Sequence, residues 1–148
     1  MKKVAIRDVS SFNNKSIQIN GWVYNSRRSG KIGFLMLRDG FGLLQCIVEK
    51  KQIGEEQFDE FKRLTQETSI SVKGKVVEND RATGGYELLV DSFKVHQISI
   101  DYPITPKEHG TDFLMNNRHL WLRSKRQHAI LKVRHQIIKS IRDFFDMN

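Results

Sequence analysis

Hydrophobic and polar residues alternate through much of the first hundred positions, which is the pattern of half-buried β-strands. Three such segments follow one another closely, at Ile17–Tyr24, Ile32–Arg38 and Gly42–Glu49. Pairs of turn-forming residues separate them, Ser29-Gly30 after the first segment and Asp39-Gly40 after the second. The pattern therefore predicts three consecutive antiparallel strands.

The period changes within Gln52–Gln66, where apolar side chains recur every third residue with charges between them, as in a short amphipathic helix. Alternation returns in Ser69–Glu78 and Tyr86–Ile100, which predict two further strands. This order predicts a mainly β protein. We expect a five-stranded Greek-key barrel, the OB-fold, with its helix between strands 3 and 4. An SH3-like barrel is the alternative, but it normally lacks that helix.

The remainder of the chain reads as a linker followed by a helix. Residues 101–123 contain both prolines and show no clear period, which indicates a hinge. Ser124 is placed as an N-cap, with Gln127 as its capping-box partner, and a helix is expected to about Asp146. The predicted organisation is a barrel over 1–100, a hinge over 101–123 and the start of a long helix over 124–148.

That helix has an unusually wide apolar face, which a missing domain or a second copy of the chain would cover. Its apolar residues are Ile130, Leu131, Val133, Ile137, Ile138, Ile141, Phe144 and Phe145.

Composition narrows the class of partner. The net charge is +8 and the isoelectric point about 9.7, a balance that favours a polyanion such as nucleic acid. No apolar run reaches the length of a membrane span, and no secretory signal follows the first residues. The single cysteine, Cys46, lies in an apolar strand and is expected to fill the core, with a reactive thiol as the alternative. These features predict a cytoplasmic protein.

Strand alternation places three polar or aromatic residues on one outer face of the barrel. If Leu35, Cys46 and Leu88 point inward, their neighbours Phe34, Gln45 and Glu87 point outward. An exposed aromatic ring can stack on a nucleobase, an amide can bond a base edge, and a carboxylate can accept from an amino group.

Two arginines could add to this face. Arg27 and Arg28, near the end of the first strand, can reach a phosphate or a base edge. The alternative for each of the five residues is ordinary packing or solvation on a strand surface.

Catalytic signatures are missing from the sequence. The five histidines have no metal-ligand spacing with Cys46, and neither a hydrolytic triad nor a Gly-rich phosphate loop is found. The sequence therefore predicts no catalytic, cofactor-binding or metal-binding residues.

Several short motifs resemble one enzyme family in combination. They are Gly21-Trp22-Val23, the Arg27 pair, Gly33-Phe34-Leu35-Met36-Leu37-Arg38-Asp39, Gly42-Leu43-Leu44-Gln45 and Tyr86-Glu87-Leu88. The chain resembles the N-terminal part of class II aminoacyl-tRNA synthetases of the aspartyl, asparaginyl and lysyl subgroup. In that family this region is an anticodon-binding OB-fold. The resemblance implies that Phe34 stacks on the middle anticodon base, a uridine, that Arg27 and Gln45 bond the same base, and that Glu87 meets the first base.

The segment after the barrel resembles the asparaginyl branch of this subgroup. It contains Tyr102-Pro103-Ile104-Thr105, Lys107-Glu108-His109-Gly110 and Asn117-Arg118-His119-Leu120-Trp121-Leu122-Arg123. The last run departs from the Arg-x-x-Asp-Leu-Arg pattern of aspartyl enzymes. The final helix is similar to the start of class II motif 1, which implies a homodimer through 124–148. The ATP- and Mg²⁺-dependent chemistry would then belong to a catalytic domain beyond Asn148, and this segment alone should be inactive.

The leading hypothesis is therefore the tRNA anticodon-binding segment of an enzyme that attaches asparagine to tRNA. The alternatives are an aspartyl-type synthetase domain, a stand-alone OB protein that binds single-stranded nucleic acid, and an interaction module that self-associates through Ile130–Phe145.

Overall fold

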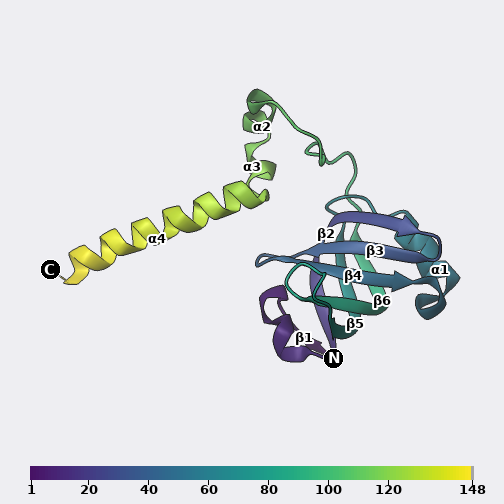
Figure 1. Cartoon of the computed structure of the whole chain (residues 1–148). Coiled ribbons are helices and arrows are strands. Elements are labelled where there is room, and N and C mark those ends of the chain that lie inside the picture. Colours follow the sequence, from purple (N-terminus) through teal and green to yellow (C-terminus); the bar gives the residue numbers. More distant parts are fainter. Residues whose placement is uncertain (148) are drawn as a thin grey trace. The chain divides into compact units, whose positions relative to one another are not determined.

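The computed structural model describes residues 1–147, and the chain divides into two compact units. The first unit is Met1–Tyr102, and the second begins at Pro103. In Figure 1 the first unit is a strongly curled sheet with a helix against it, whereas the second consists of a coil followed by helices joined by short turns.

The first unit contains all the strands found in residues 1–147. Its strands are β1 (Lys2–Lys3), β2 (Ser16–Ser29), β3 (Ile32–Arg38), β4 (Leu43–Glu49), β5 (Ser69–Glu78) and β6 (Tyr86–Gln97). Its helices are the 3₁₀ helix η1 (Ile6–Phe12) and the α-helix α1 (Lys50–Lys62).

The five long strands pair in a ring. β2, β3 and β4 are joined as consecutive antiparallel neighbours, and β4 then pairs in parallel with β6. β6 pairs with β5, and β5 returns to β2. Helix α1 connects the third and fourth long strands. This is the five-stranded barrel order that the hydrophobic pattern predicts, so the predicted fold class is confirmed.

Inward-facing residues of the strands fill the barrel, as alternation predicts. Leu35, Leu37, Cys46 and Leu88 are fully buried. Helix α1 closes the core with Phe58 and Phe61, both of which are buried and belong to the same cluster as the strand residues.

Gly33 is required where α1 meets the barrel wall. A Cβ atom at this position would lie 2.3 Å from Cε1 of Phe61, which is closer than any packed contact allows. The missing side chain therefore lets the Phe61 ring reach β3.

Three predicted boundaries differ from the structure. β2 continues past Tyr24 to Ser29 after a register shift between Val23 and Asn25. Its polar end shows no alternation because this part of the strand is largely exposed, although its backbone still pairs with β3. Helix α1 begins at Lys50 and is kinked at Gly54, where φ is 83°. The last strand ends at Gln97 instead of Ile100.

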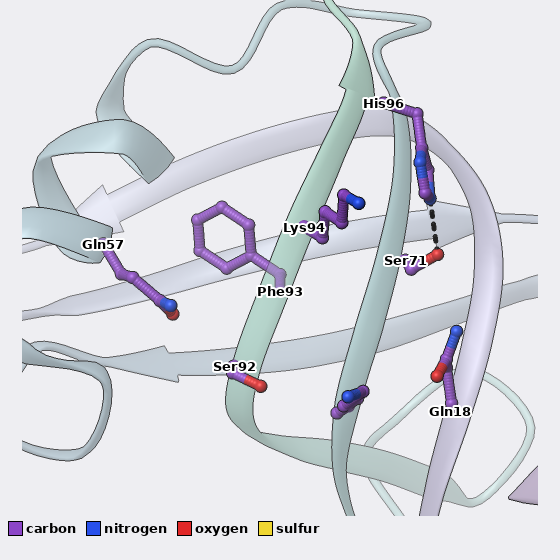
Figure 2. A pocket seen from close by; sticks show the side chains of 8 residues that line it. Gln18, Gln57, Ser71, Ser92, Phe93, Lys94 and His96 are labelled. Carbon is purple, nitrogen blue, oxygen red and sulfur yellow. Dashed lines mark hydrogen bonds between the residues drawn. The ribbon is translucent and has the colours of Figure 1, made fainter. Parts of the chain in front are cut away.

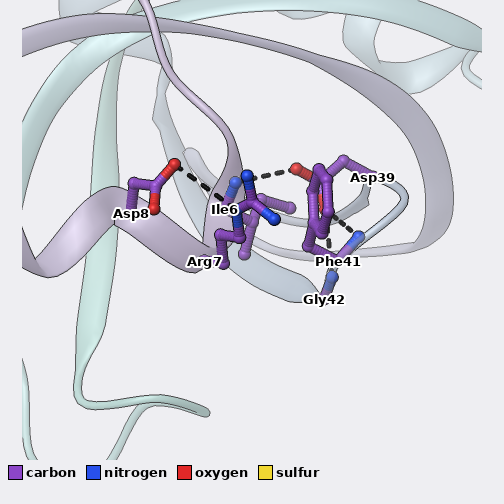
Figure 3. Close-up of polar contacts among 6 residues, drawn as sticks. All are labelled: Ile6, Arg7, Asp8, Asp39, Phe41 and Gly42. Atoms are coloured by element: carbon purple, nitrogen blue, oxygen red, sulfur yellow. Dashed lines mark hydrogen bonds and ion pairs between the residues drawn. The ribbon is translucent and has the colours of Figure 1, made fainter. Parts of the chain in front are cut away.

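Asp39 anchors the turn between β3 and β4 and also the N-terminal segment (Figure 3). Its Oδ1 accepts from the backbone N–H groups of Phe41 and Gly42, at 2.7 and 3.0 Å. Its Oδ2 accepts from the backbone N–H of Ile6, 33 positions away, at 2.7 Å. The predicted Asp39-Gly40 turn is confirmed, and the structure adds a long-range role that turn chemistry alone does not reveal.

The second unit contains three helices, α2 (Thr111–Asn116), α3 (Arg118–Trp121) and α4 (Lys125–Met147). The first two lie inside the segment predicted as a hinge, which is therefore helical in part. Helices of 6 and 4 residues are too short to display a period in sequence. Ser124 caps α4 as predicted, since its Oγ accepts from the backbone N–H of Gln127 at 3.3 Å.

All eight apolar residues of the α4 stripe are exposed, from 37% for Leu131 to 74% for Phe145. No helix within residues 1–147 combines the length and the apolar character that crossing a membrane requires.

Candidate nucleic-acid interface

One outer face of the barrel brings together four of the five predicted site residues. Arg27 of β2 is the register partner of Phe34 of β3. Gln45 of β4 is the register partner of Glu87 of β6. Phe34 and Gln45 are diagonal neighbours, because Gln45 pairs with Met36, two residues beyond Phe34. We call Arg27, Phe34, Gln45 and Glu87 the reading face.

The aromatic residue of the reading face is covered by an arginine. The guanidinium carbon of Arg27 lies 4.5 Å from the centroid of the Phe34 ring, which is within cation–π distance. Phe34 itself is half-buried at its strand position, and the Arg27 guanidinium covers part of its ring.

The two polar residues of the reading face bond each other. The side-chain Nε2 of Gln45 donates to Oε1 of Glu87 at 2.5 Å. Glu87 is only 8% exposed, although it points to the outside of the barrel, because its neighbours on β4 and β5 flank it closely. The Gln45 amide therefore holds the Glu87 carboxylate in place on the reading face.

Cys46, which follows Gln45 on β4, has an unreactive thiol. Cys46 is fully buried, and burial raises the pKa of its thiol well above its ordinary value, with a further contribution from the nearby Glu87 carboxylate. The sequence prediction of a core cysteine is confirmed, and the alternative of a reactive thiol is wrong.

Arg28 lies apart from the other four. It pairs with Gly33, whose position faces the barrel interior, so alternation directs Arg28 away from the side that carries Arg27. Its side chain is exposed at the end of the β2–β3 ribbon. It can meet a phosphate there, but it does not contribute to the reading face.

Sequence reasoning overlooked two exposed aromatic residues. Trp22 and Tyr24 flank the buried Val23 on β2 and are 39% and 38% exposed. Alternation around Val23 could have identified them, since an inward valine sends both neighbours outward.

A polar hollow lies elsewhere on the barrel, with a volume of about 320 Å³ (Figure 2). It carries Lys73 and Lys94 from β5 and β6, and a 2.6 Å hydrogen bond between Ser71 and His96. Its Phe93 ring is only 7% exposed, and its exposed ring, His96, is hydrogen-bonded to Ser71. The reading face sets an aromatic ring beside an arginine and an amide, which makes it the better candidate for base recognition.

The structure of residues 1–147 contains no candidate metal site. Among residues 1–147 no three side chains of histidine, cysteine, aspartate or glutamate gather in a way that could hold an ion.

A ring of five strands that carries an aromatic ring and hydrogen-bonding side chains on one face has the architecture of the OB-fold, on which many proteins bind nucleic acid. Residues 17–95 match the model of a family described as an OB-fold nucleic acid binding domain, and the chain belongs to this family.

A known relative indicates more specifically which kind of protein this chain is similar to. The chain is 52% identical, over 144 residues, to the protein described as asparagine--tRNA ligase of Sorangium cellulosum (strain So ce56). The match covers 97% of this chain and 32% of that protein, so the chain spans about a third of its relative's length.

Solved structures show the same similarity to asparaginyl-tRNA synthetases. The chain matches asparaginyl-tRNA synthetase from Pyrococcus horikoshii, solved with asparaginyl-adenylate, with a TM-score of 0.89 and 35% identity, over 97% of this chain and 34% of that one. A putative aspartyl-tRNA synthetase from Leishmania major Friedlin has a TM-score of 0.88, with 97% of this chain and 32% of that one covered, but only 21% identity. The second likeness concerns the fold alone, and the aspartyl alternative is no better supported.

Proposed function

We propose that this chain binds the anticodon stem-loop of a tRNA through its reading face. The observation that carries the proposal is the contiguous placement of Arg27, Phe34, Gln45 and Glu87 on one side of an OB-fold nucleic acid binding domain. Stacking on Phe34 supplies sequence-tolerant affinity, and the hydrogen-bonding groups beside it supply the choice of base.

Each residue has a distinct role in this proposal. The middle anticodon base, a uridine, stacks on Phe34 and takes the place that the Arg27 guanidinium occupies over the ring. Arg27 and Gln45 then bond that same base. One oxygen of the Glu87 carboxylate accepts from Gln45, and the other is assigned to the first anticodon base. Arg28, on the other side of β2, contributes through phosphate.

The test is filter binding with matched anticodon stem-loops that differ only at the middle position. We expect uridine to bind more tightly than adenosine by about 5- to 150-fold, the range of one good bidentate contact. Equal affinity for the two loops would exclude base readout.

For the whole protein we propose an asparagine–tRNA ligase. The support is 52% identity to such a protein across nearly all of this chain. The ligase would use ATP and Mg²⁺ to activate asparagine, and we assign that chemistry to the two thirds of the relative that this chain does not span. The cytoplasm is the compartment that fits this function and a free, buried Cys46.

Within that protein, α4 would be the first part of class II motif 1 and would form a homodimer. Its support is the exposed apolar stripe, which needs a covering surface. Sedimentation checks this: we expect self-association that Ile137→Glu abolishes, whereas Lys132→Glu, on the opposite side of the helix by its period, leaves it intact. A strict monomer at high concentration would contradict the dimer.

The second candidate function is sequence-tolerant binding of single-stranded nucleic acid. The net charge of +8 and the exposed aromatic residues favour it. It predicts strong salt dependence with no preference among anticodon loops, so the same binding experiment separates the two candidates.

A further inference from the structure

The hydrogen bond between Gln45 and Glu87 restricts which way the Gln45 amide can face. Nε2 of Gln45 donates to Oε1 of Glu87 at 2.5 Å. An ionised carboxylate only accepts hydrogen bonds, whereas an amide has a donating and an accepting end. Turning the amide by half a rotation would set its oxygen against the carboxylate oxygen. Because two acceptors at this distance repel, Glu87 holds the amide in one orientation.

Burial strengthens this restriction. Glu87 is 8% exposed and is paired to β4 and β5 on its two sides, so its carboxylate has little room to withdraw. Little water reaches the Glu87 carboxylate to replace a lost hydrogen bond, so leaving this group unsatisfied would be costly.

The orientation matters because the two pyrimidines present opposite groups at the same place. Uracil has a donor at N3, flanked by two carbonyl acceptors. Cytosine has an acceptor at N3 and an amino donor at C4. A freely rotating amide can match either edge, by accepting from uracil N3–H or by donating to cytosine N3. An amide held with its oxygen toward the base N3 position matches uracil and opposes cytosine.

We propose that Glu87 is a positioning residue that locks the Gln45 amide and thereby makes the reading face select uridine over cytidine at the middle position. The proposal rests on the proposed function and deepens it. Phe34 contributes the second constraint, since a base stacked on a ring fixed to β3 cannot slide along its edge to find another match.

The variant that tests this is Glu87→Gln, which keeps the shape of the side chain. A glutamine at this position can either accept from or donate to Gln45, so both orientations of the Gln45 amide become possible. Glu56→Gln is the matched control, because it makes the same charge change at an exposed site on α1. Each protein is titrated with stem-loops carrying uridine or cytidine at the middle position.

For the unaltered chain and for Glu56→Gln we expect uridine to be preferred by about 5- to 150-fold. In Glu87→Gln the ratio should fall toward unity, because the Gln45 amide can then turn its donor toward cytidine N3. Any loss of the Glu87 contact with the first anticodon base weakens both loops equally and leaves this ratio unchanged. If Glu87→Gln keeps the original ratio of uridine to cytidine affinity, the proposal that Glu87 fixes the Gln45 amide is overturned, while the proposed anticodon binding stands. If the unaltered chain prefers neither uridine nor any other base, the proposed function itself fails.

A second measurement keeps the proposal testable if Glu87→Gln does not fold. The two side-chain amide protons of Gln45, assigned by their loss in Gln45→Leu, are followed by NMR in the unaltered chain. If the Glu87 carboxylate holds one of these protons, the chemical shifts of the two protons should differ clearly. The held proton should also exchange slowly with solvent. Two protons with the shifts and exchange of a solvated glutamine would overturn the lock.

Discussion

The guanidinium of Arg27 lies over the ring of Phe34, with its central carbon 4.5 Å from the ring centroid. The two residues are register partners on β2 and β3, so the barrel itself holds them together. An exposed cation–π contact contributes about 0.5–1 kcal/mol, whereas stacking of a base on an aromatic ring contributes about 1–3 kcal/mol. A base can therefore displace the guanidinium, which then becomes available to bond it.

Replacing Phe34 with alanine should weaken anticodon binding by about 1–3 kcal/mol, because the stacking surface is lost. Stability should change little, since Phe34 lies outside the buried core. Phe41→Ala is the matched control: Phe41 is 49% exposed and also carries an arginine, Arg7, 3.9 Å from its ring centroid. Fluorescence titration with one stem-loop compares the variants. An equal loss for both would assign Phe34 to general surface contact.

The neighbouring arginines should differ in what they recognise. Arg27→Gln should reduce the preference for uridine at the middle position, because Arg27 lies on the reading face. Arg28→Gln should weaken all loops equally and make the slope of log K against log salt shallower by about 0.7, as expected for one phosphate contact to a single strand. Binding isotherms at several salt concentrations measure both effects. A loss of base preference in Arg28→Gln would reverse this assignment.

Gly33→Ala should destabilise the barrel by about 1–3 kcal/mol, the usual cost of overpacking. The added Cβ would meet Cε1 of Phe61 at 2.3 Å, so this buried ring would have to shift within the core. Gly40→Ala provides the control, since a Cβ there meets no atom within 4 Å. Urea unfolding gives the free energies of both variants. Similar midpoints for the two would show that α1 adapts without loss.

The Cys46 thiol should resist labelling reagents until the protein unfolds, because burial raises its pKa and keeps it neutral. In the unfolded chain the same thiol ionises near pH 8.5. Since only the unfolded state loses this proton, stability should decline as the pH rises above about 8.5, and Cys46→Ala should lack that part of the decline. Labelling rates with and without urea test the first expectation. Fast reaction in the absence of urea would contradict it.

Prediction from sequence succeeded best for the barrel strands. β3 and β5 have the predicted bounds, because a wall that is buried on one side and wet on the other imposes strict alternation on its residues. It failed where no such contrast exists. The exposed end of β2 and the short helices α2 and α3 leave no period in the sequence, since their backbone pairing and turns do not depend on a buried face.

The candidate site divides in the same way. Alternation alone sends Phe34, Gln45 and Glu87 outward, so the sequence by itself determined the chemistry that this surface can offer. Alternation does not say which residues are neighbours. Gln45 and Glu87 are 42 positions apart, and only the parallel pairing of β4 with β6 sets the amide against the carboxylate. The same holds for Arg27 over Phe34, and for Arg28 directed away from it. Side-chain direction is a local property of a strand, whereas register between strands depends on how the whole barrel closes, and that was decided by the tertiary structure.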